Sequence, residues 1–209
     1  YMIVNTTYML FNTTYMLMKI YRENVTQFKY IKRDGFVMTY ITSVCKPFSE
    51  DEREHLATNF FNGMIKNHPY LNELYRLILL KMKYFTIKDN KISQLRYSNQ
   101  HGWHFTITYC DITGSLRPMV IIKKLKRDDC TYEIRINGDY DKSRLLFFYV
   151  SQEIMEEVLF ILSYGYSKNS GKQDLTDVLA QSTKSIKADI ESASNTNEKI
   201  TEWVGGNWK

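Results

Sequence analysis

Three apolar, β-prone segments follow one another in the second half of the chain, and they constrain the fold more than any other feature. They are CTYEIRI at 130–136, RLLFFYV at 144–150 and EEVLFILSYGY at 156–166. The first connection contains an Asn-Gly-Asp turn sequence at 137–139, and the second connection is equally short. Consecutive strands joined by short turns pair antiparallel. The sequence therefore predicts a three-stranded antiparallel meander.

Helical signals flank this meander. Ser49 and Glu52 have the spacing of a capping box, and apolar residues then recur every four positions. Pro69 suits the first turn of a second helix, so residues 49–83 are predicted to form a helical hairpin. A last amphipathic helix is predicted from about Asp174. Its predicted apolar face consists of Leu175, Val178, Leu179, Ile186 and Ile190.

The predicted fold class is α+β: a small antiparallel β-sheet with a helical hairpin and a C-terminal helix packed on it. The first strand is predicted within 36–45. Residues 84–115 have alternating apolar positions and are treated as an inserted β segment in a domain that spans 27–192. Residues 1–26, which contain a duplicated heptapeptide, and residues 193–209 are predicted to be tails.

The N-terminal duplication and the cysteines bear on the compartment. The duplicated segment lacks the basic start and continuous apolar core of a signal peptide, and its Asn-Thr-Thr steps interrupt it too often for a membrane span. Three widely spaced cysteines form no disulfide framework. His101 and His104 are three residues apart but have no obvious third ligand. We expect a cytoplasmic protein without a membrane partner, a metal or a cofactor.

Basic residues near the meander are the candidate functional residues, since the chain contains no P-loop, GxSxG, HExxH or dinucleotide-binding motif. Arg135 and Arg144 lie inside apolar strands, where a charged group needs a partner or a ligand. The remaining candidates are Lys123, Lys124, Lys126, Arg127, Lys168 and Lys172. Two interpretations stay open here: charges that are solvated or paired with nearby aspartates, and charges that bind nucleic-acid phosphates.

The order of these signals is specific. A Lys-Leu step at 124–125 precedes Tyr-Glu-Ile-Arg at 132–135, Arg144 starts the next apolar strand, and Tyr-Ser-Lys-Asn at 166–169 ends the third. This order, followed by an amphipathic helix, resembles the C-terminal half of RelE/HigB-like toxins (RelE/ParE superfamily) of bacterial type II toxin–antitoxin systems, and in particular their phage-derived HigB-like branch. The resemblance is best over 120–190 and extends over 36–192 with 84–115 as an insertion.

The resemblance implies an mRNA interferase, an endoribonuclease that cleaves mRNA, usually on the ribosome, and that a cognate antitoxin protein neutralises. No metal is needed, because the RNA 2′-OH attacks the adjacent phosphate and the protein supplies proton transfer and positive charge. Arg135 and Arg144 would clamp the scissile phosphate, and Lys168 would assist or act as the acid. The residues that would hold flanking phosphates or ribosomal RNA are Lys123, Lys124, Lys126, Arg127 and Lys172. Tyr166 would stack on a base or serve in proton transfer.

The chain also departs from the family pattern. Asn169 stands where the family often has a second basic residue, and Leu175 where some members have a catalytic tyrosine. His104 lies on the inserted segment, and the sequence does not place it relative to the meander. The alternative function is a non-catalytic binding protein of phage or mobile-element origin on the same scaffold. Such a protein would inhibit a host machine, or poison gyrase as ParE-type members do.

Overall fold

The structure is a computed structural model of the 209-residue chain. It describes residues 38–47, 53–67, 69–110, 115–126, 128, 130–137, 142–152, 157–168 and 173–205. The duplicated heptapeptide, the Ser49–Glu52 capping box and most of the 137–139 turn lie outside the described residues. So do Arg127 and Lys172, two of the candidate residues.

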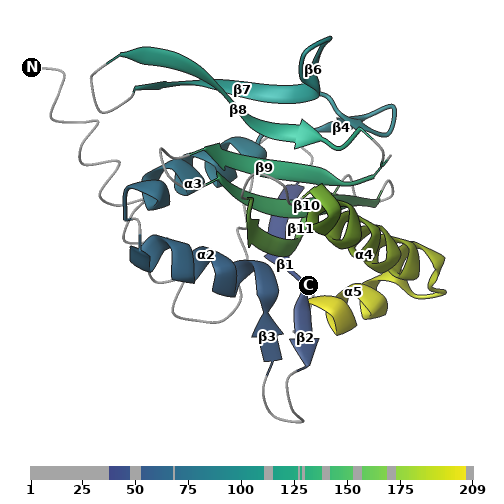
Figure 1. The fold of residues 1–209 in the computed structure, drawn as a ribbon. Coiled ribbons are helices and arrows are strands. Elements are labelled where there is room, and N and C mark those ends of the chain that lie inside the picture. Colours follow the sequence, from purple (N-terminus) through teal and green to yellow (C-terminus); the bar gives the residue numbers. More distant parts are fainter. Residues whose placement is uncertain are drawn as a thin grey trace, which may run out of the picture.

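The described chain begins with strands, continues with a pair of helices and a long run of strands, and ends with two helices (Figure 1). The first half contains β1 (Met38–Ser43), β2 (Cys45–Pro47), β3 (Arg53–His55), α2 (Leu56–Asn67), α3 (Pro69–Met82), β4 (Ile87–Lys88), β5 (Lys91–Ile92) and β6 (Arg96–Ser98). The second half contains β7 (Gly102–Cys110), β8 (Leu116–Lys124), β9 (Tyr132–Asn137), β10 (Lys142–Gln152), β11 (Glu157–Ser167), α4 (Gln173–Ser192) and α5 (Thr196–Val204). Residues 196–204, which the sequence placed in a tail, thus form a helix.

One seven-stranded sheet dominates the fold. Its strand order is β1-β11-β10-β9-β8-β7-β6, and two small two-stranded ladders, β2-β3 and β4-β5, lie outside it. Strands β9, β10 and β11 pair antiparallel, as the meander requires. Strand β1 pairs parallel with β11, and the pairs from β9 out to β6 are antiparallel. The sheet is therefore mixed.

The predicted fold class was wrong: the sheet is large and mixed, not a small antiparallel one. Part of the difference arises at β8, which the prediction left outside the meander. Ile122, Lys123 and Lys124 of β8 pair with Ile134, Glu133 and Tyr132 of β9, and the ladder continues through β7 to β6. An edge strand leaves a row of N–H and C=O groups unpaired, and an added strand satisfies them. Strands β6 and β7, from the segment treated as an insertion, are thus part of the main sheet.

Helices α2 and α3 cover one face of the sheet. On β9, Tyr132, Ile134 and Ile136 point to this face and belong to the larger apolar core, because alternate strand residues point to the same side. Helix α2 approaches β11 so closely that a Cβ on Gly165 would overlap the Phe60 side chain. Only glycine fits at this position without a clash, because its Cα carries no side chain.

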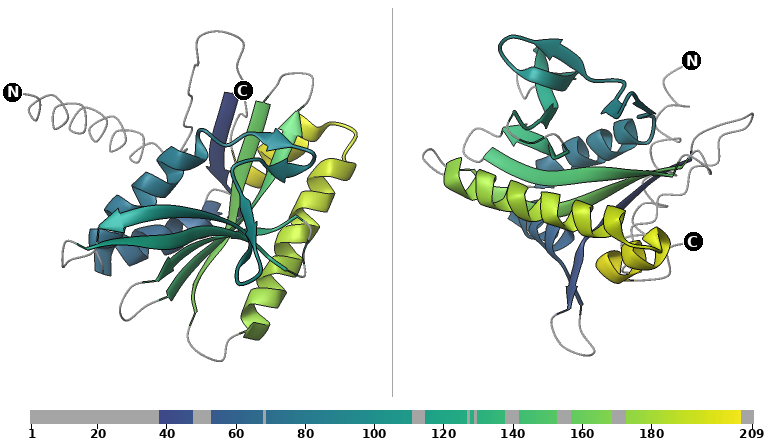
Figure 2. Two further views of the ribbon diagram at one scale, coloured as in Figure 1. Left: turned by 90° about the horizontal axis from the view of Figure 1, so that it is seen from above. Right: turned by 90° about the vertical axis from the view of Figure 1, so that its right-hand side faces the viewer.

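Helices α4 and α5 cover the other face, and Figure 2 shows α4 lying along it. Ile186 and Ile190 pack there as predicted, but Leu175 and Val178 are exposed. Helix α4 instead turns the buried Thr176 and Thr183 inward, where their hydroxyls form hydrogen bonds with Tyr166 and Ser163. These hydrogen bonds between α4 and β11 therefore determine which side of α4 faces the sheet. The apolar pattern alone did not predict that side.

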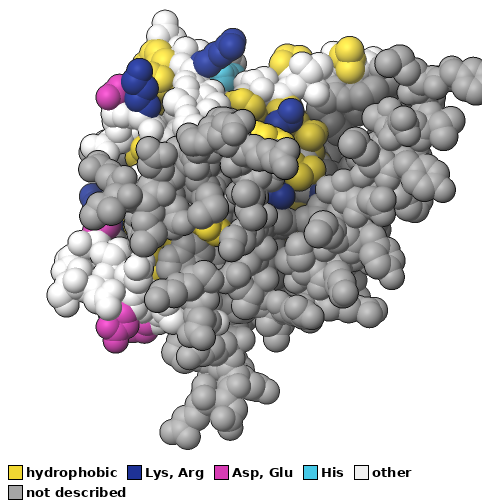
Figure 3. All heavy atoms as spheres, turned by 180° about the vertical axis from the view of Figure 1, so that it is seen from behind, with side chains coloured by type: hydrophobic (Ala, Val, Ile, Leu, Met, Phe, Trp, Pro, Cys, Tyr) yellow, Lys and Arg dark blue, Asp and Glu magenta, His cyan; other side chains and the backbone are white. Residues whose placement is uncertain are grey.

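The two helical layers cover the sheet unevenly. The main contacts of α2 and α4 with the sheet are to β1, β10 and β11. Strands β6, β7 and β8 extend beyond them, and Figure 3 shows hydrophobic side chains exposed at this end of the molecule. Tyr97 on β6 and Leu116 on β8 are two such exposed side chains. None of the described helices combines the length and the apolar character needed to cross a membrane.

Candidate nucleic-acid interface

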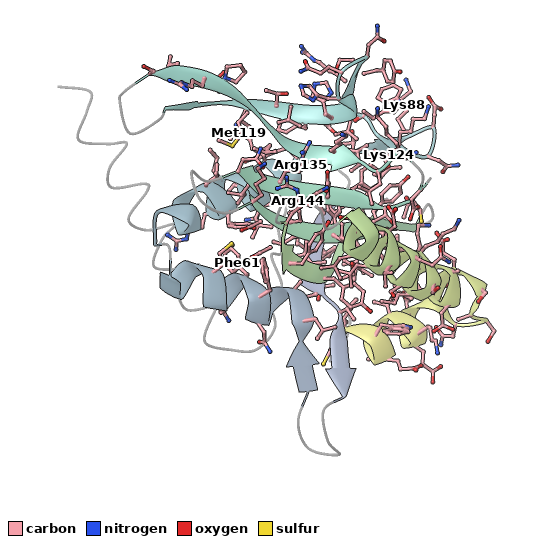
Figure 4. All side chains as sticks on the ribbon, in the orientation of Figure 1. Phe61, Lys88, Met119, Lys124, Arg135 and Arg144 are labelled. Atoms are coloured by element: carbon pink, nitrogen blue, oxygen red, sulfur yellow. The ribbon has the colours of Figure 1, made fainter. Side chains whose placement is uncertain are left out.

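The face of the sheet that α4 partly covers carries a row of charged residues on neighbouring strands. Lys123 of β8 lies opposite Glu133 of β9, and Arg135 of β9 lies opposite Arg144 of β10. Opposite residues share a face, and Glu133 and Arg135 are two positions apart on one strand, so all four side chains lie on the same side. Figure 4 shows Arg135 and Arg144 side by side in the middle of the sheet. We call this set, together with Lys168, the basic face.

Arg144 is a buried member of the basic face. Its residue surface is 2% exposed, and its guanidinium donates hydrogen bonds to the carbonyls of Ile136 (3.3 Å) and Ser143 (2.7 Å) and to Oδ1 of Asn137 (3.1 Å). Burial, followed by the charge of Arg135, lowers its pKa. So little exposed surface leaves no room for a phosphate on this side chain, and Arg144 therefore positions its neighbours.

Glu133 lies between the two arginines. Its Oε1 is 3.3 Å from Nε of Arg135, and its Oε2 is 3.7 Å from Nε of Arg144. The Arg135 side chain is 21% exposed, against 6% for that of Glu133. Both Nε atoms are buried and make no hydrogen bond to a described residue. Arg135, whose side chain is partly exposed, is thus the arginine that a ligand can reach.

Lys123 extends the positive charge toward the open end of the sheet. It is half-buried, and burial lowers its pKa, as do the charges of Arg135, Lys126 and Lys168; Glu133 opposes them. These groups are therefore close enough to interact electrostatically. Lys123 thus interacts with three other cations and one carboxylate, and this excess of positive charge favours a bound anion.

Other predicted residues lie elsewhere. Lys124 lies opposite Tyr132, whose side chain belongs to the core, so Lys124 is on the face opposite to Lys123. Tyr166 lies opposite Arg144, but its ring is 6% exposed and its hydroxyl donates a 2.9 Å hydrogen bond to Thr176 of α4. Burial is the main cause that raises its pKa. The structure does not offer this ring to a base.

Strand β7 adds a histidine that the sequence did not place. His104 lies opposite Lys123 and opposite Arg96 of β6, so it joins the side of the sheet that carries Glu133. Its Nδ1 is 2.8 Å from the carbonyl oxygen of Gly102, and the rings of His101 and His104 have centroids 5.3 Å apart. Burial and the charges of His104, Lys123 and Arg135 lower the pKa of His101. The histidine pair therefore borders the basic face.

Sequence reasoning placed Glu133 on the face of Arg135 but assigned it no role, and it left His104 unassigned. The signal for Glu133 was its i, i+2 spacing with Arg135 inside a strand, which places both on one face. No protein-family model, curated protein or solved structure matches this chain. The function must therefore be inferred from the chemistry of the basic face.

Proposed function

We propose that this chain binds RNA through the basic face and cleaves it without a metal ion, as an mRNA interferase. The observation that carries the proposal is the grouping of Lys123, Arg135 and Arg144 around Glu133 on one sheet face. A guanidinium matches the geometry of a phosphate, and an ammonium adds charge without fixed direction. RNA carries its own nucleophile in the 2′-OH, so the protein needs only positive charge and proton transfer.

The motif order along β9, β10 and β11 adds a second argument. It resembles that of RelE/HigB-like toxins, which implies mRNA on the ribosome as the substrate and an antitoxin as the neutralising partner. The seven-stranded sheet departs from the small sheet expected for that family. The proposal therefore rests on the charged groups first and on the resemblance second.

The test of binding uses a labelled 12-nucleotide RNA with 2′-O-methyl groups, which cannot be cut. Lys123→Ala and Arg135→Ala should each weaken binding and lower the slope of log Kd against log salt by about one. Lys184→Ala, a change at an exposed lysine on α4, is the matched control and should leave both quantities unchanged. Equal affinity and slope for all four proteins would refute RNA binding at this face.

The test of cleavage is induced expression in bacteria. The wild type should arrest growth and leave cut mRNAs, and Arg135→Ala should relieve both effects. Growth arrest with intact mRNA would exclude the interferase and favour a non-catalytic inhibitor, and gyrase-dependent DNA breaks would identify a gyrase poison. No growth defect and intact mRNA would refute the proposed activity.

A further inference from the structure

We propose that Tyr97, on the edge strand β6, is a platform on which a base of single-stranded RNA stacks, and that Lys91 binds the neighbouring phosphate. The inference rests on the proposed function and deepens it, because it adds a base contact to the phosphate contacts of the basic face. The residues of this site lie on β5, β6 and β7, outside the motifs of the resemblance.

Tyr97 presents an exposed ring that its neighbour holds in place. The residue is 62% exposed, and β6 is the last strand in the order of the large sheet. Its ring centroid lies 5.6 Å from that of Trp103, and the two ring planes are inclined by 63°. Trp103 is partly buried and packs against the larger apolar core. The contact therefore anchors Tyr97 while most of its surface stays open to a ligand.

Lys91 places a positive charge beside these two rings. Its side chain is exposed, and its Nζ lies 5.0 Å from the centroid of the Trp103 ring. A cation is attracted to the face of an indole, which keeps the ammonium next to the aromatic pair. An ammonium has three donors, so Lys91 can bind a phosphate while it stays over the ring. An aromatic ring beside a cation is the combination with which proteins bind single-stranded nucleic acids.

The β4–β5 hairpin concentrates positive charge at this site. Lys88 lies directly opposite Lys91, and like charges at opposite positions of two strands destabilise the pair. Asp89 stands in the turn between them, yet no carboxylate of the described residues forms an ion pair with either lysine. Figure 4 shows Lys88 at the end of the molecule where Figure 1 shows β6. A bound phosphate would relieve this repulsion.

Hydrogen bonds and apolar contacts fix the hairpin to the rest of the fold. The side-chain oxygen of Gln94 accepts a 3.0 Å hydrogen bond from the Thr86 amide, and its side-chain nitrogen donates a 3.1 Å hydrogen bond to the Tyr84 carbonyl. Ile92 and Leu95, on either side of this contact, are buried in the larger core. The lysines therefore stand on a fixed part of the surface, next to the Tyr97 ring.

The platform adjoins the basic face across the edge of the sheet. Arg96 precedes Tyr97 on β6 and lies opposite His104, which in turn lies opposite Lys123. Consecutive strand residues point to opposite faces, so Arg96 extends the basic face and Tyr97 lies on the other side of the edge. A strand that crosses β6 would place phosphates on one side and a base on the other. Such a path suits single-stranded RNA, whose unstacked bases can turn outward, and excludes a duplex.

The experiment measures the affinity of the full chain for the 12-nucleotide 2′-O-methyl RNA. Tyr97→Ala should weaken binding by about 5- to 150-fold and leave the slope of log Kd against log salt unchanged, because stacking releases no counterion. Tyr97→Phe keeps the ring and should bind within threefold of wild type. Lys91→Ala should lower the slope by about one. Leu116→Ala, at an exposed side chain at the opposite end of the β7–β8 ladder, is the matched control and should change neither quantity.

A set of abasic RNAs separates stacking from a structural role of the ring. In each RNA, one base of the twelve is replaced by an abasic residue. For one position in this set, wild type should bind the abasic RNA as weakly as Tyr97→Ala binds the intact RNA. Tyr97→Ala should lose no further affinity for that RNA, because the two changes remove the same contact.

The outcomes distinguish the inference from the proposed function. If Tyr97→Ala binds within threefold of wild type while Lys123→Ala and Arg135→Ala bind weakly, the inference is overturned and RNA binding at the basic face stands. A loss at Tyr97→Ala that is equal for the intact RNA and for every abasic RNA also overturns it. So does unchanged RNA affinity with a changed oligomeric state, which would assign the ring to a contact between copies of the chain. A wild type without affinity for RNA overturns both the inference and the proposed function.

Discussion

Replacing Arg144 with Ala should destabilise the fold far more than replacing Arg135 with Ala, although both are arginines in contact with Glu133. The Arg144 guanidinium makes three hydrogen bonds in a site that is 2% exposed, and it is 3.7 Å from Oε2 of Glu133. Removing one partner of a buried ion pair costs about 3–5 kcal/mol, because the other charge and two carbonyls lose their partner. A chain of this size loses roughly 2–4 °C of Tm per kcal/mol, so Tm should fall by about 6–20 °C.

Urea unfolding of the purified proteins at pH 7 measures this difference. Arg135→Ala, at a side chain that is 21% exposed, should cost about 1 kcal/mol. Arg96→Ala, at an exposed arginine on β6, should change stability by less than about 0.5 kcal/mol. The double variant Glu133→Gln with Arg144→Ala should cost less than the sum of the two single changes. Additive costs, or an Arg144→Ala midpoint equal to that of Arg135→Ala, would refute a positioning role for Arg144.

Two further changes probe the scaffold of the basic face. Asp128 accepts hydrogen bonds from the Cys130 and Thr131 amides and from the Thr131 hydroxyl. Burial alone would raise the pKa of the Asp128 carboxyl, but these hydrogen bonds outweigh it and lower the pKa. Asp128→Ala should therefore lose about 1–3 kcal/mol in urea unfolding at pH 7. This difference should shrink as pH falls below about 4, and a constant difference down to pH 2 would contradict the hydrogen-bonded carboxylate. Gly165→Ala should cost about 1–3 kcal/mol through overlap with the Phe60 side chain. Phe60→Ala removes the ring but keeps the Cβ, so it should reduce that additional cost without abolishing it. An unchanged Tm for Gly165→Ala would contradict the close approach.

Local patterns predicted the meander because its strands are apolar, β-prone and joined by short connections. The strand predicted at 144–150 became β10, and that at 156–166 became β11, each with a boundary shifted by at most two residues. The size of the sheet was not predictable in the same way. Alternation over 103–109 indicates a strand but not its partner, and the pairing of β1 with β11 joins residues that are far apart in the chain.

In the candidate site, too, local sequence patterns predicted some features, and others depend on how distant segments pack together. Arg135 and Arg144 stood out because a charge inside an apolar strand needs a partner, and Glu133 supplies it. Their different exposure follows from what covers each strand, which no local pattern records. His104 joins the basic face only through the registers of β7 with β8 and of β8 with β9. Tyr166 resembles an exposed stacking residue in sequence, but α4 covers it through Thr176.

The most direct test of the central claim compares one single-stranded sequence made as RNA and as DNA. Each is incubated with the purified protein in EDTA, with and without ribosomes, and the ends of the products are identified by mass. The account predicts that the RNA is cut to a 2′,3′-cyclic phosphate and a 5′-OH end, while the DNA is bound and stays intact because it has no 2′-OH. Intact RNA under every condition, or DNA cut at the same rate as RNA, would contradict it.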